Sequence, residues 1–356
     1  MAMLHLASAP SVLPHGSAAV PLSLSVERDG LDATIDAAIR WKPQVCFSHN
    51  MRDLEVERRL LALCPVAKFM HGYFGTCIGG QKMFARPVAR PCSRTFGLPC
   101  VALYLPLGCG QVSVLGLARQ YRWAREQRAL FDRYRFIVVA SEHMKREYVR
   151  NGADPRKVRV NALFASLETQ GNRASELAAP TVAFVGRMTR LKGGDLLVRA
   201  IADASTRLAT PIDLIMIGDG PQRGAWETLA QQLGVRSTFV GWKEGDERAA
   251  CLRRASLLAV PSVWPEPFGL VGLEAGALGV PAIAFDVGGI REWLRPGENG
   301  YLVSGDRPRA SALADGLVAA FRNADELRAM GCKAASVARQ MSLDRHVDRL
   351  EEILAG

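Results

Sequence analysis

Two acidic residues, Glu266 and Glu274, are the side chains of this chain best suited to hold a ligand rich in hydroxyl groups. A carboxylate accepts two hydroxyl hydrogen bonds at once, which is how proteins commonly hold the diol of a ribose or a hexose. A helix is predicted from Leu270 onward, and eight residues of helix span about 12 Å. This length suits one ligand that carries a sugar at each end of a diphosphate. A pair of ordinary solvated glutamates on a surface helix is the alternative.

Two further segments indicate a phosphate site between these acids. The N–H groups at the start of the predicted helix, at Gly269 and Leu270, form a ready anion site. Upstream, the apolar run 181–185 leads into a loop with Arg187 and Lys192, which would offer a guanidinium fork and a point charge to a diphosphate. An α/β sheet commonly binds its ligands where a strand is followed by a loop and a helix, and here that loop is basic. Two solvated loop cations are the alternative.

This combination resembles the family-4 retaining glycosyltransferases of the GT-B fold, strongly over residues 180–305 and more loosely over 40–165. The four charged side chains named above carry the resemblance, and further motifs occur beside them in the family's order. These motifs are Gly218-Asp219-Gly220-Pro221, Phe239-Val240-Gly241, Ala259-Val260-Pro261-Ser262, Gly288-Gly289-Ile290-Arg291-Glu292 and Gly297-Glu298-Asn299-Gly300-Tyr301-Leu302-Val303. The resemblance implies an α/β protein with two Rossmann-like domains that face each other across a cleft.

The resemblance also implies roles for individual residues. Arg187 and Lys192 would stabilise the departing nucleotide by electrostatics, with no metal ion and no cofactor besides the nucleotide-diphospho-sugar co-substrate. Glu266 would contact hydroxyl groups of the donor sugar, and Glu274 would hold the ribose. His71, at a predicted strand end, would contact the sugar or the acceptor, and a histidine that merely caps a strand is the alternative. The donor site would be completed by the backbone of Phe268, Gly269 and Leu270 beside the sugar and phosphates, and by Gly218 and Gly241 beside the base.

The leading hypothesis is therefore a hexosyltransferase that moves a sugar from a nucleotide-diphospho-sugar to a glycan or lipid-linked acceptor, in cell-envelope polysaccharide synthesis. Family membership implies retention of the anomeric configuration, by a same-face reaction in which the leaving phosphate helps to deprotonate the acceptor. One alternative is a catalytically inactive nucleotide-sugar-binding partner protein with a degraded donor loop. Another is a GT-B epimerase that acts on a nucleotide sugar.

The whole chain has a formal net charge of +10, and its two halves differ in charge. Residues 1–165 hold 23 Lys and Arg against 12 Asp and Glu, whereas residues 166–356 hold 22 against 23. A basic acceptor-side half fits an acidic acceptor or an anionic membrane surface, and a merely basic surface is the alternative. No nucleic-acid-binding motif accompanies the charge, so nucleic acid is not expected as a partner.

The chain starts without a basic region followed by an apolar run, so we expect no secretory signal and a cytoplasmic location, with peripheral contact at the inner face of the membrane. A reducing cytoplasm would keep the eight cysteines as thiols. Cys77, Cys92, Cys100 and Cys109 cluster in one loop-rich stretch, but their gaps do not match the Cys-x2-Cys spacing of zinc sites. We therefore predict no metal site, and a structural metal or a disulfide pair is the alternative.

The order of elements predicts four parts. They are an N-terminal acceptor-side domain over 1–169, a linker over 170–180, a nucleotide-sugar-binding domain over 181–340, and a terminal helix over 341–356 that packs back on the first domain. A doubly wound parallel sheet is predicted for the third part, with strands at 181–186, 212–217, 237–241, 256–260 and 281–285. Helices are predicted near 192–208, 222–234, 246–254 and 270–278. Because no strand followed by a Gly-rich loop and a helix is found at the start, we expect the first domain to lack its first β-α-β unit.

Residues 99–118 carry no charge, which is long enough for a membrane-spanning helix, but prolines and glycines within the stretch argue against one. A buried or membrane-dipping segment is predicted instead. Four arginines follow at a spacing of three and are predicted to line one helix face that contacts the membrane or the acceptor, with a solvated face as the alternative. They are Arg119, Arg122, Arg125 and Arg128. Among the other histidines, His49 is assigned a structural role, and His143 and His346 are assigned to helix surfaces.

Overall fold

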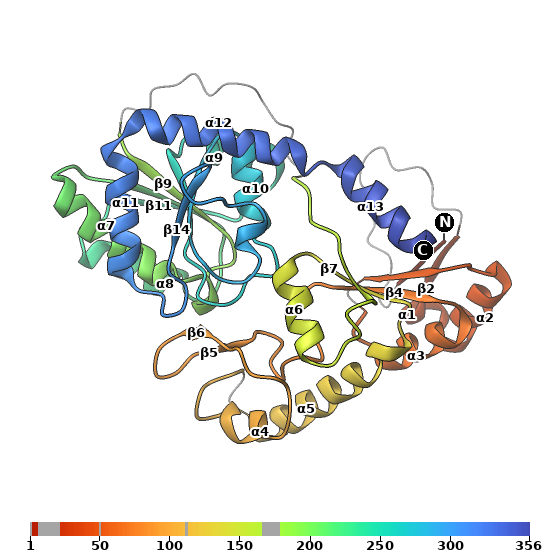
Figure 1. The fold of residues 1–356 in the computed structure, drawn as a ribbon. Helices are drawn as coiled ribbons and strands as arrows, with labels where there is room; N and C mark the ends of the chain where they lie inside the picture. Colours follow the sequence, from red (N-terminus) through yellow and green to blue (C-terminus); the bar gives the residue numbers. More distant parts are fainter. Residues whose placement is uncertain (1, 6–21, 50, 111–112, 166–178) are drawn as a thin grey trace.

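The computed structural model describes residues 2–5, 22–49, 51–110, 113–165 and 179–356, arranged in two lobes (Figure 1). The N-terminal lobe is drawn in red to yellow and the C-terminal lobe in green to blue. The predicted linker, 170–180, lies outside the described residues except at its last two positions. Each lobe is built on a parallel sheet, so the predicted α/β class is confirmed.

The C-terminal lobe contains a six-stranded parallel sheet in the order β11-β10-β9-β12-β13-β14. Successive strands step outward from β9 in one direction and from β12 in the other. The two halves of the sheet therefore meet between β9 and β12, where the order reverses and where open α/β sheets bind ligands. The strands are β9 (Thr181–Val185), β10 (Asp213–Ile217), β11 (Ser237–Gly241), β12 (Leu257–Val260), β13 (Ala282–Phe285) and β14 (Gly300–Val303).

Helices cover both faces of this sheet. In α7 (Gly194–Leu208) the buried side chains recur every three or four residues, for example at Leu197, Ile201 and Ala204, so one face packs on the sheet. The four helices predicted for this lobe are confirmed within a few residues, whereas β14 and the last two helices were not predicted. The remaining helices are α8 (Arg223–Gln232), α9 (Gly245–Arg253), α10 (Leu270–Ala277), α11 (Ala310–Arg322) and α12 (Ala324–Gln340).

The N-terminal lobe is built on a four-stranded parallel sheet in the order β3-β4-β7-β8. A separate parallel pair joins β1 (Ala2–His5) to β2 (Leu22–Ser25). A strand at 2–5 was not predicted, and residues 6–21 lie outside the described part of the chain, so the expected loss of a β-α-β unit stays a prediction. The other elements are β3 (Cys46–His49), β4 (Val66–Met70), β7 (Phe136–Val139), β8 (Val158–Val160), α1 (Val26–Asp29), α2 (Leu31–Trp41), α3 (Leu54–Leu63) and α6 (Glu142–Arg150).

Between β4 and β7 the chain forms an irregular insertion rather than one crossover helix. It holds the two-residue strands β5 (Met83–Phe84) and β6 (Arg90–Pro91), then α4 (Pro99–Tyr104) and α5 (Val114–Ala129). The uncharged stretch 99–118 is thus divided between α4, a loop and the start of α5. No helix in the described part of the chain is long and apolar enough to cross a bilayer.

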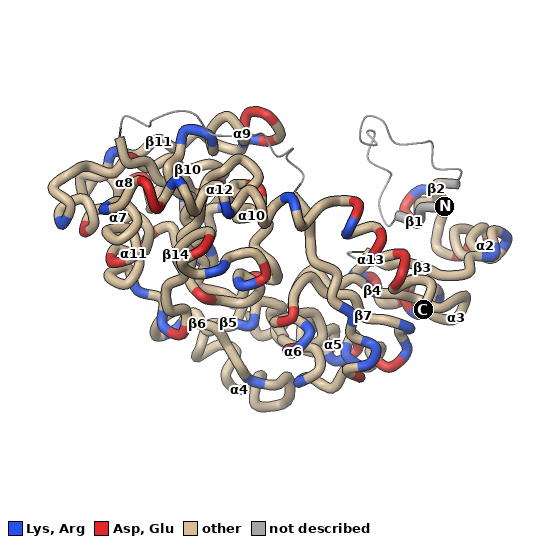
Figure 2. The backbone as a smooth tube through the Cα atoms, turned by 45° about the horizontal axis from the view of Figure 1, so that its top comes forward, with Lys and Arg blue, Asp and Glu red and all other residues tan. Residues whose placement is uncertain are grey.

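The arginines of α5 do not share one face, which corrects the prediction. At a spacing of three residues, each arginine lies about 60° further around the helix than the one before it. The fourth arginine therefore points away from the first. Arg119, Arg122 and Arg125 are exposed, whereas Arg128 turns inward and donates a hydrogen bond to the carbonyl of Phe96 at 3.1 Å. Figure 2 shows blue Lys and Arg positions gathered around α5 and α6.

The last helix, α13 (Leu343–Ala355), leaves α12 and lies against the N-terminal lobe (Figure 1). The ring Nδ1 of His346 lies 2.7 Å from the carbonyl oxygen of Ala162, and Asn161 donates a hydrogen bond to the carbonyl of His346. His346 therefore joins the terminal helix to the first lobe, which corrects its assignment to a plain helix surface.

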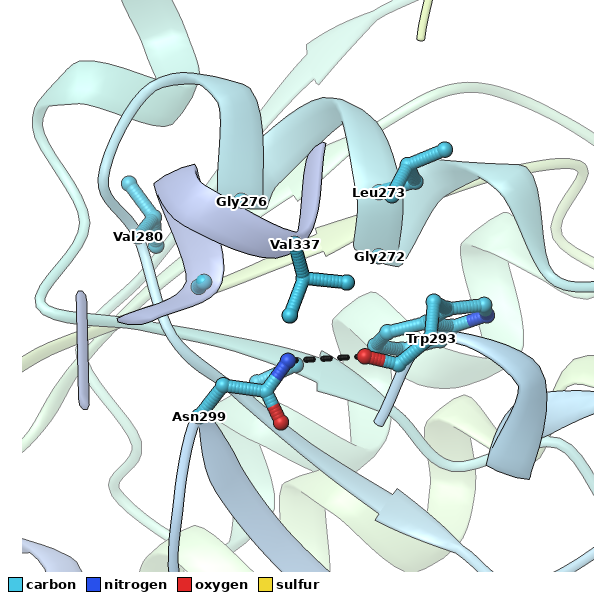
Figure 3. Close-up of a pocket in the computed structure, with 9 residues that line it drawn as sticks. Gly272, Leu273, Gly276, Val280, Trp293, Asn299 and Val337 are labelled. Carbon is cyan, nitrogen blue, oxygen red and sulfur yellow. Dashed lines mark hydrogen bonds between the residues drawn. The ribbon is translucent and has the colours of Figure 1, made fainter. Parts of the chain in front are cut away.

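Small residues let α10 approach its neighbours closely (Figure 3). Gly272 faces the indole of Trp293, and Gly276 faces α12. Asn299 donates a hydrogen bond of 2.7 Å to the carbonyl of Trp293, which holds the indole against the helix, and Val337 of α12 closes the far side. This packing fixes the position of α10, the helix that carries Glu274.

Gly272→Ala should lower the free energy of unfolding by about 3 kcal/mol, because an added methyl group would lie 1.9 Å from the Trp293 ring. Gly224→Ala is the matched control, since an added methyl group there meets nothing within 4 Å. Alanine in the exposed helix α8 should stabilise the protein by about 0.5–1 kcal/mol. Urea unfolding followed by circular dichroism would measure both, and equal midpoints for the two variants would contradict this packing.

Candidate active site

The loops that follow the six strands of the C-terminal sheet all leave from its carboxyl edge, because the strands are parallel. The two central loops are 186–193 after β9 and 261–269 after β12. They are joined by a backbone hydrogen bond of 2.9 Å from Val263 to Leu191. Gly193 is at φ +62°, and a side chain there would collide with the carbonyl of Pro261. The sequence thus closes these loops on each other at the point where the strand order reverses.

Glu266 lies at the centre of this edge and is buried, with 4 % of its surface exposed. Its Oε1 accepts hydrogen bonds from Ser262 Oγ at 2.5 Å, Lys192 Nζ at 2.7 Å and Trp264 Nε1 at 3.0 Å. A buried carboxylate needs such partners to remain charged. No hydrogen bond from the described residues reaches Oε2, so that oxygen is available to a ligand.

Lys192 and Arg187 belong to the same loop but lie in different surroundings. The Lys192 ammonium pairs with Glu266 and lies 5.8 Å from the centre of the Trp264 ring. Arg187 is exposed, and among the described residues it makes no hydrogen bond or ion pair. The structure therefore pairs Lys192 with the buried Glu266 carboxylate and leaves the Arg187 guanidinium, on the same loop, exposed to solvent.

The N-terminus of α10 opens beside Glu266. Gly269 is the N-cap, at φ +82°, and no side chain of the described residues caps the helix. The carbonyl of Phe268 is taken by the indole N–H of Trp293 at 2.8 Å, which anchors the turn. Uncapped N–H groups at a helix start attract anions, and Leu270 follows Glu266, the partner of Lys192, by four residues.

Glu274 is buried in α10, with 3 % of its surface exposed, and its Oε1 accepts a hydrogen bond of 2.8 Å from Arg248 Nη2 in α9. The Nε atom of Arg248 is buried, and no described residue forms a hydrogen bond with it. Sequence analysis did not single out Arg248, because an arginine in a polar helix gives no signal. The two acids of the pair are therefore both held by cations, Glu266 by Lys192 and Glu274 by Arg248.

Glycines close the edge of the site where the base is predicted to lie. Gly218 is at φ +126°, and a side chain there would lie 2.1 Å from the carbonyl oxygen of Gly186. Its N–H donates to the carbonyl of Gly241 at 2.8 Å. Gly218 and Gly241 thus bring the ends of β9, β10 and β11 together. On the other side, Gly289 donates to the carbonyl of Glu266 at 2.7 Å and braces that loop.

The N-terminal lobe contacts this edge directly. Tyr73, which follows β4, is fully buried and donates a hydrogen bond of 2.8 Å to the carbonyl of Pro265, and its ring meets Trp264 edge-on. Glu292 accepts a hydrogen bond of 2.7 Å from the backbone N–H of Glu142 at the start of α6. The loop that holds Glu266 is therefore covered by the opposite lobe.

His71 lies two residues before Tyr73, at the end of β4. Its Nε2 is 2.8 Å from Nδ1 of His49 at the end of β3, and both rings pack against Phe69. Burial lowers the pKa of His71, and the ammonium of Lys68 adds to that shift. Loss of water around His49, followed by the neighbouring His71, lowers its pKa to about 4. Both rings are therefore neutral at pH 7, so His71 meets a ligand as an uncharged hydrogen-bonding group.

Sequence analysis gave no individual role to four residues around the predicted site: Ser262, which was named only within a motif, Trp264, Tyr73 and Arg248. Ser262 and Trp264 lie next to Glu266 in sequence, so proximity could have indicated them. Tyr73 acts from the other lobe, and its partner Pro265 is 192 positions away. His143, assigned to a helix surface, is half-buried and meets the Tyr73 ring edge-on at 6.1 Å between ring centres.

A doubly wound lobe whose carboxyl edge faces a second α/β lobe defines the GT-B class. Solved structures share this fold. An Anabaena protein, Alr3699/HepE, solved with UDP and glucose, superposes with a TM-score of 0.68 at 16 % identity over 95 % of this chain and 86 % of that one. Sucrose-phosphate synthase from Thermosynechococcus elongatus superposes with a TM-score of 0.66 at 20 % identity over 91 % of this chain and 76 % of that one.

Residues 168–337 match the family model of the glycosyl transferases group 1. Over this segment the chain is similar to the group 1 glycosyltransferases, and its fold is that of the GT-B class. A D-inositol 3-phosphate glycosyltransferase of Nocardia farcinica is 35 % identical over 234 residues, which are 61 % of this chain and 51 % of that protein. The chain spans about half the length of the curated relatives it matches.

Within the described residues, no group of three or more His, Cys, Asp or Glu side chains is arranged so that it could hold a metal ion. The cations at the carboxyl edge are protein side chains, Lys192, Arg187 and Arg248. The predicted independence of metal ions stays a prediction.

Arg248→Met should lower the free energy of unfolding by about 3 kcal/mol, because it leaves the buried Glu274 carboxylate without this cation. Adding Glu274→Gln to that variant should restore part of the loss, since a neutral amide needs no countercharge. Arg295→Met is the control, because the Arg295–Glu298 pair is exposed and 3.7 Å long, and it should cost under about 1 kcal/mol. Urea unfolding that finds Arg248→Met and Arg295→Met equally stable would contradict the pairing.

The histidine pair should titrate below the ordinary range. NMR titration of the ring C–H signals should give a midpoint of about 4 for His49 and a lowered midpoint for His71. Between these values and the unfolded pKa of about 6.5, the unfolded chain binds more protons than the folded one. The pair should therefore reduce stability as pH falls below about 6.5, and His49→Phe should lessen that loss. Midpoints near 6.5 for both rings would contradict the arrangement.

Proposed function

We propose that this chain is a retaining hexosyltransferase, similar to glycosyltransferase family 4, that uses a nucleotide-diphospho-sugar as donor and needs no metal ion. The observation that carries the proposal is the placement of Glu266 and Lys192 at the reversal of the strand order, beside the uncapped N-terminus of α10. This arrangement offers a carboxylate oxygen for sugar hydroxyls and a cation with helix N–H groups for phosphates.

In the proposed complex, the diphosphate lies between Lys192, Arg187 and the N–H groups at Leu270. Glu266 uses its free Oε2 to hold a hydroxyl group of the donor sugar, and Glu274 holds the ribose. Lys192 can serve both the acid and the phosphates because an ammonium has three donors. Arg187 is exposed at the loop, so its guanidinium is free to turn onto the phosphates.

In the proposed reaction, the bond between C1 of the sugar and the diphosphate oxygen breaks as the acceptor oxygen bonds to C1 on the same face. The electron pair of the broken bond stays on the nucleoside diphosphate, and the proton of the acceptor hydroxyl passes to the departing phosphate. Lys192, Arg187 and the helix N–H groups stabilise the charge that builds on that phosphate. In this proposal His71, neutral at pH 7, holds the sugar or the acceptor by a hydrogen bond.

The acceptor is proposed to be a glycan or lipid-linked molecule used in cell-envelope polysaccharide synthesis. The basic half of the chain favours an anionic acceptor, and the similarity to a D-inositol 3-phosphate glycosyltransferase makes a polyol phosphate a reasonable first compound to try. The insertion exposes large apolar side chains at Leu98, Val114 and Leu115, and the last two begin α5, the helix that carries the exposed arginines. Apolar tips beside cations suit peripheral contact with an anionic membrane.

Incubation with a panel of nucleotide sugars should release nucleoside diphosphate slowly, and faster when the right acceptor is added. Lys192→Met should lower the turnover number by about 100-fold or more, because a cation that stabilises the leaving group is lost. Lys333→Met, on the exposed face of α12, should leave it unchanged. NMR of the product should show the anomeric configuration of the donor.

Other outcomes separate the alternatives. Binding of nucleotide sugars without turnover by the wild-type protein would favour the inactive partner protein. An isomerised sugar on an intact nucleotide would favour the epimerase. Equal turnover by Lys192→Met and wild type would contradict the assigned role of Lys192.

A further inference from the structure

Arg52 lies in the loop after β3, three residues beyond His49 at the carboxyl edge of the N-terminal sheet. Its guanidinium carbon is 5.3 Å from the centre of the Phe74 ring and 5.2 Å from the centre of the Trp123 ring. The two rings meet edge to face, with 5.7 Å between their centres. The guanidinium is therefore held in a corner that two aromatic side chains build, one from the segment after β4 and one from α5.

The backbone at this position is held as well. The indole N–H of Trp123 donates a hydrogen bond of 2.9 Å to the carbonyl of Arg52, and the Lys68 ammonium donates one of 2.8 Å to the carbonyl of Met51. A guanidinium that rests on aromatic rings keeps its N–H groups for other partners. Because the side chain is already positioned, less of its conformational freedom is lost when an anion binds.

No acidic side chain of the described residues neutralises this guanidinium. The contacts of Arg52 in that part of the chain are with the two rings and with the indole N–H. Asp53, its neighbour in sequence, caps α3 instead, where its Oδ1 accepts hydrogen bonds from two backbone N–H groups. Arg52 is also exposed. It is therefore available to an anion that comes from outside the chain.

The segment that supplies both rings is strongly basic. Residues 71–130 hold eight Lys and Arg against one acid, Glu126. That acid is already paired with two arginines, Arg58 and Arg122. Figure 2 shows the resulting excess of blue positions around α5. A surface of one sign raises the local concentration of ligands of the opposite sign, so this corner attracts anions.

The corner adjoins the segment that reaches the opposite lobe. Phe74 directly follows Tyr73, whose hydroxyl binds the carbonyl of Pro265 in the loop after β12. His71, the predicted contact of the sugar or the acceptor, comes three residues before Phe74. Because β3 and β4 are parallel neighbours, Arg52 and His71 both follow the carboxyl ends of their strands, the edge at which α/β sheets bind ligands.

We propose that Arg52 binds an anionic group of the acceptor, a phosphate or a carboxylate, and so selects charged acceptors over neutral ones. This inference rests on the proposed function, because it concerns the acceptor side of the same reaction. No bond is made or broken at Arg52. Its planar guanidinium donates two parallel hydrogen bonds to two oxygens of the anion, while a hydroxyl group elsewhere on the acceptor reaches the donor sugar.

Isothermal titration calorimetry with two pairs of compounds, in the presence of a nucleoside diphosphate, tests this inference. The first pair is D-inositol 3-phosphate and inositol, and the second is glucuronate and glucose. Wild-type protein should bind the anionic member of at least one pair about 10-fold or more tightly than the neutral member, because hydrogen bonds to a charged group are the strong ones. A preference confined to the first pair identifies the group as a phosphate, and one confined to the second identifies a carboxylate.

Variants assign the preference to this arginine. Arg52→Gln should remove it, and Arg52→Lys, which keeps the charge but not the planar fork, should remove part of it. Arg322→Gln, at an exposed arginine of α11 in the other lobe, should keep the wild-type ratio of dissociation constants. A merely structural role of Arg52 would weaken both members of a pair alike, so the ratio reports contact with the anion.

Equal binding of both members of each pair by wild-type protein, or no binding of any of them, would overturn the inference and leave the donor reaction standing. A preference that Arg52→Gln retains would also overturn it. Arg52→Lys decides the case in which Arg52→Gln does not fold, and an unchanged ratio in that variant would contradict the role. Failure of the proposed function has a different signature, which is wild-type protein that neither binds nor cleaves nucleotide sugars.

Discussion

The ion pair between Lys192 and Glu266 is the interaction on which the rest of the site depends. It joins the loop after β9 to the loop after β12, at the single place where the order of strands in the sheet reverses. Glu266 is almost fully buried, so it needs the lysine, the hydroxyl of Ser262 and the indole of Trp264 to keep its charge. The same contacts hold one carboxylate oxygen and leave the other for a ligand.

The second lobe completes this arrangement because it reaches the same loop. Tyr73 binds the carbonyl of Pro265, next to Glu266, and His71 lies two residues earlier on the same segment.

The sequence predicted the strands of the C-terminal lobe well up to Phe285, because glycine-rich turns mark the carboxyl ends of most of them. β14 was missed although the motif at 297–303 covers it, and α11 and α12 were missed because the motifs end at Val303. The partners of the two acids, Glu266 and Glu274, could not be predicted from the sequence. Lys192 is 74 positions from Glu266, and Arg248 is 26 positions from Glu274 on another helix, so only the packed fold brings them together.

A crystal structure of the protein with a bound nucleoside diphosphate tests the central claim most directly. The account predicts that the diphosphate lies between the Lys192 ammonium and the first N–H groups of α10, with the ribose hydroxyls on Glu274 and space for a sugar at the open oxygen of Glu266. A nucleotide bound elsewhere, with the lysine and the helix start both untouched, would contradict it.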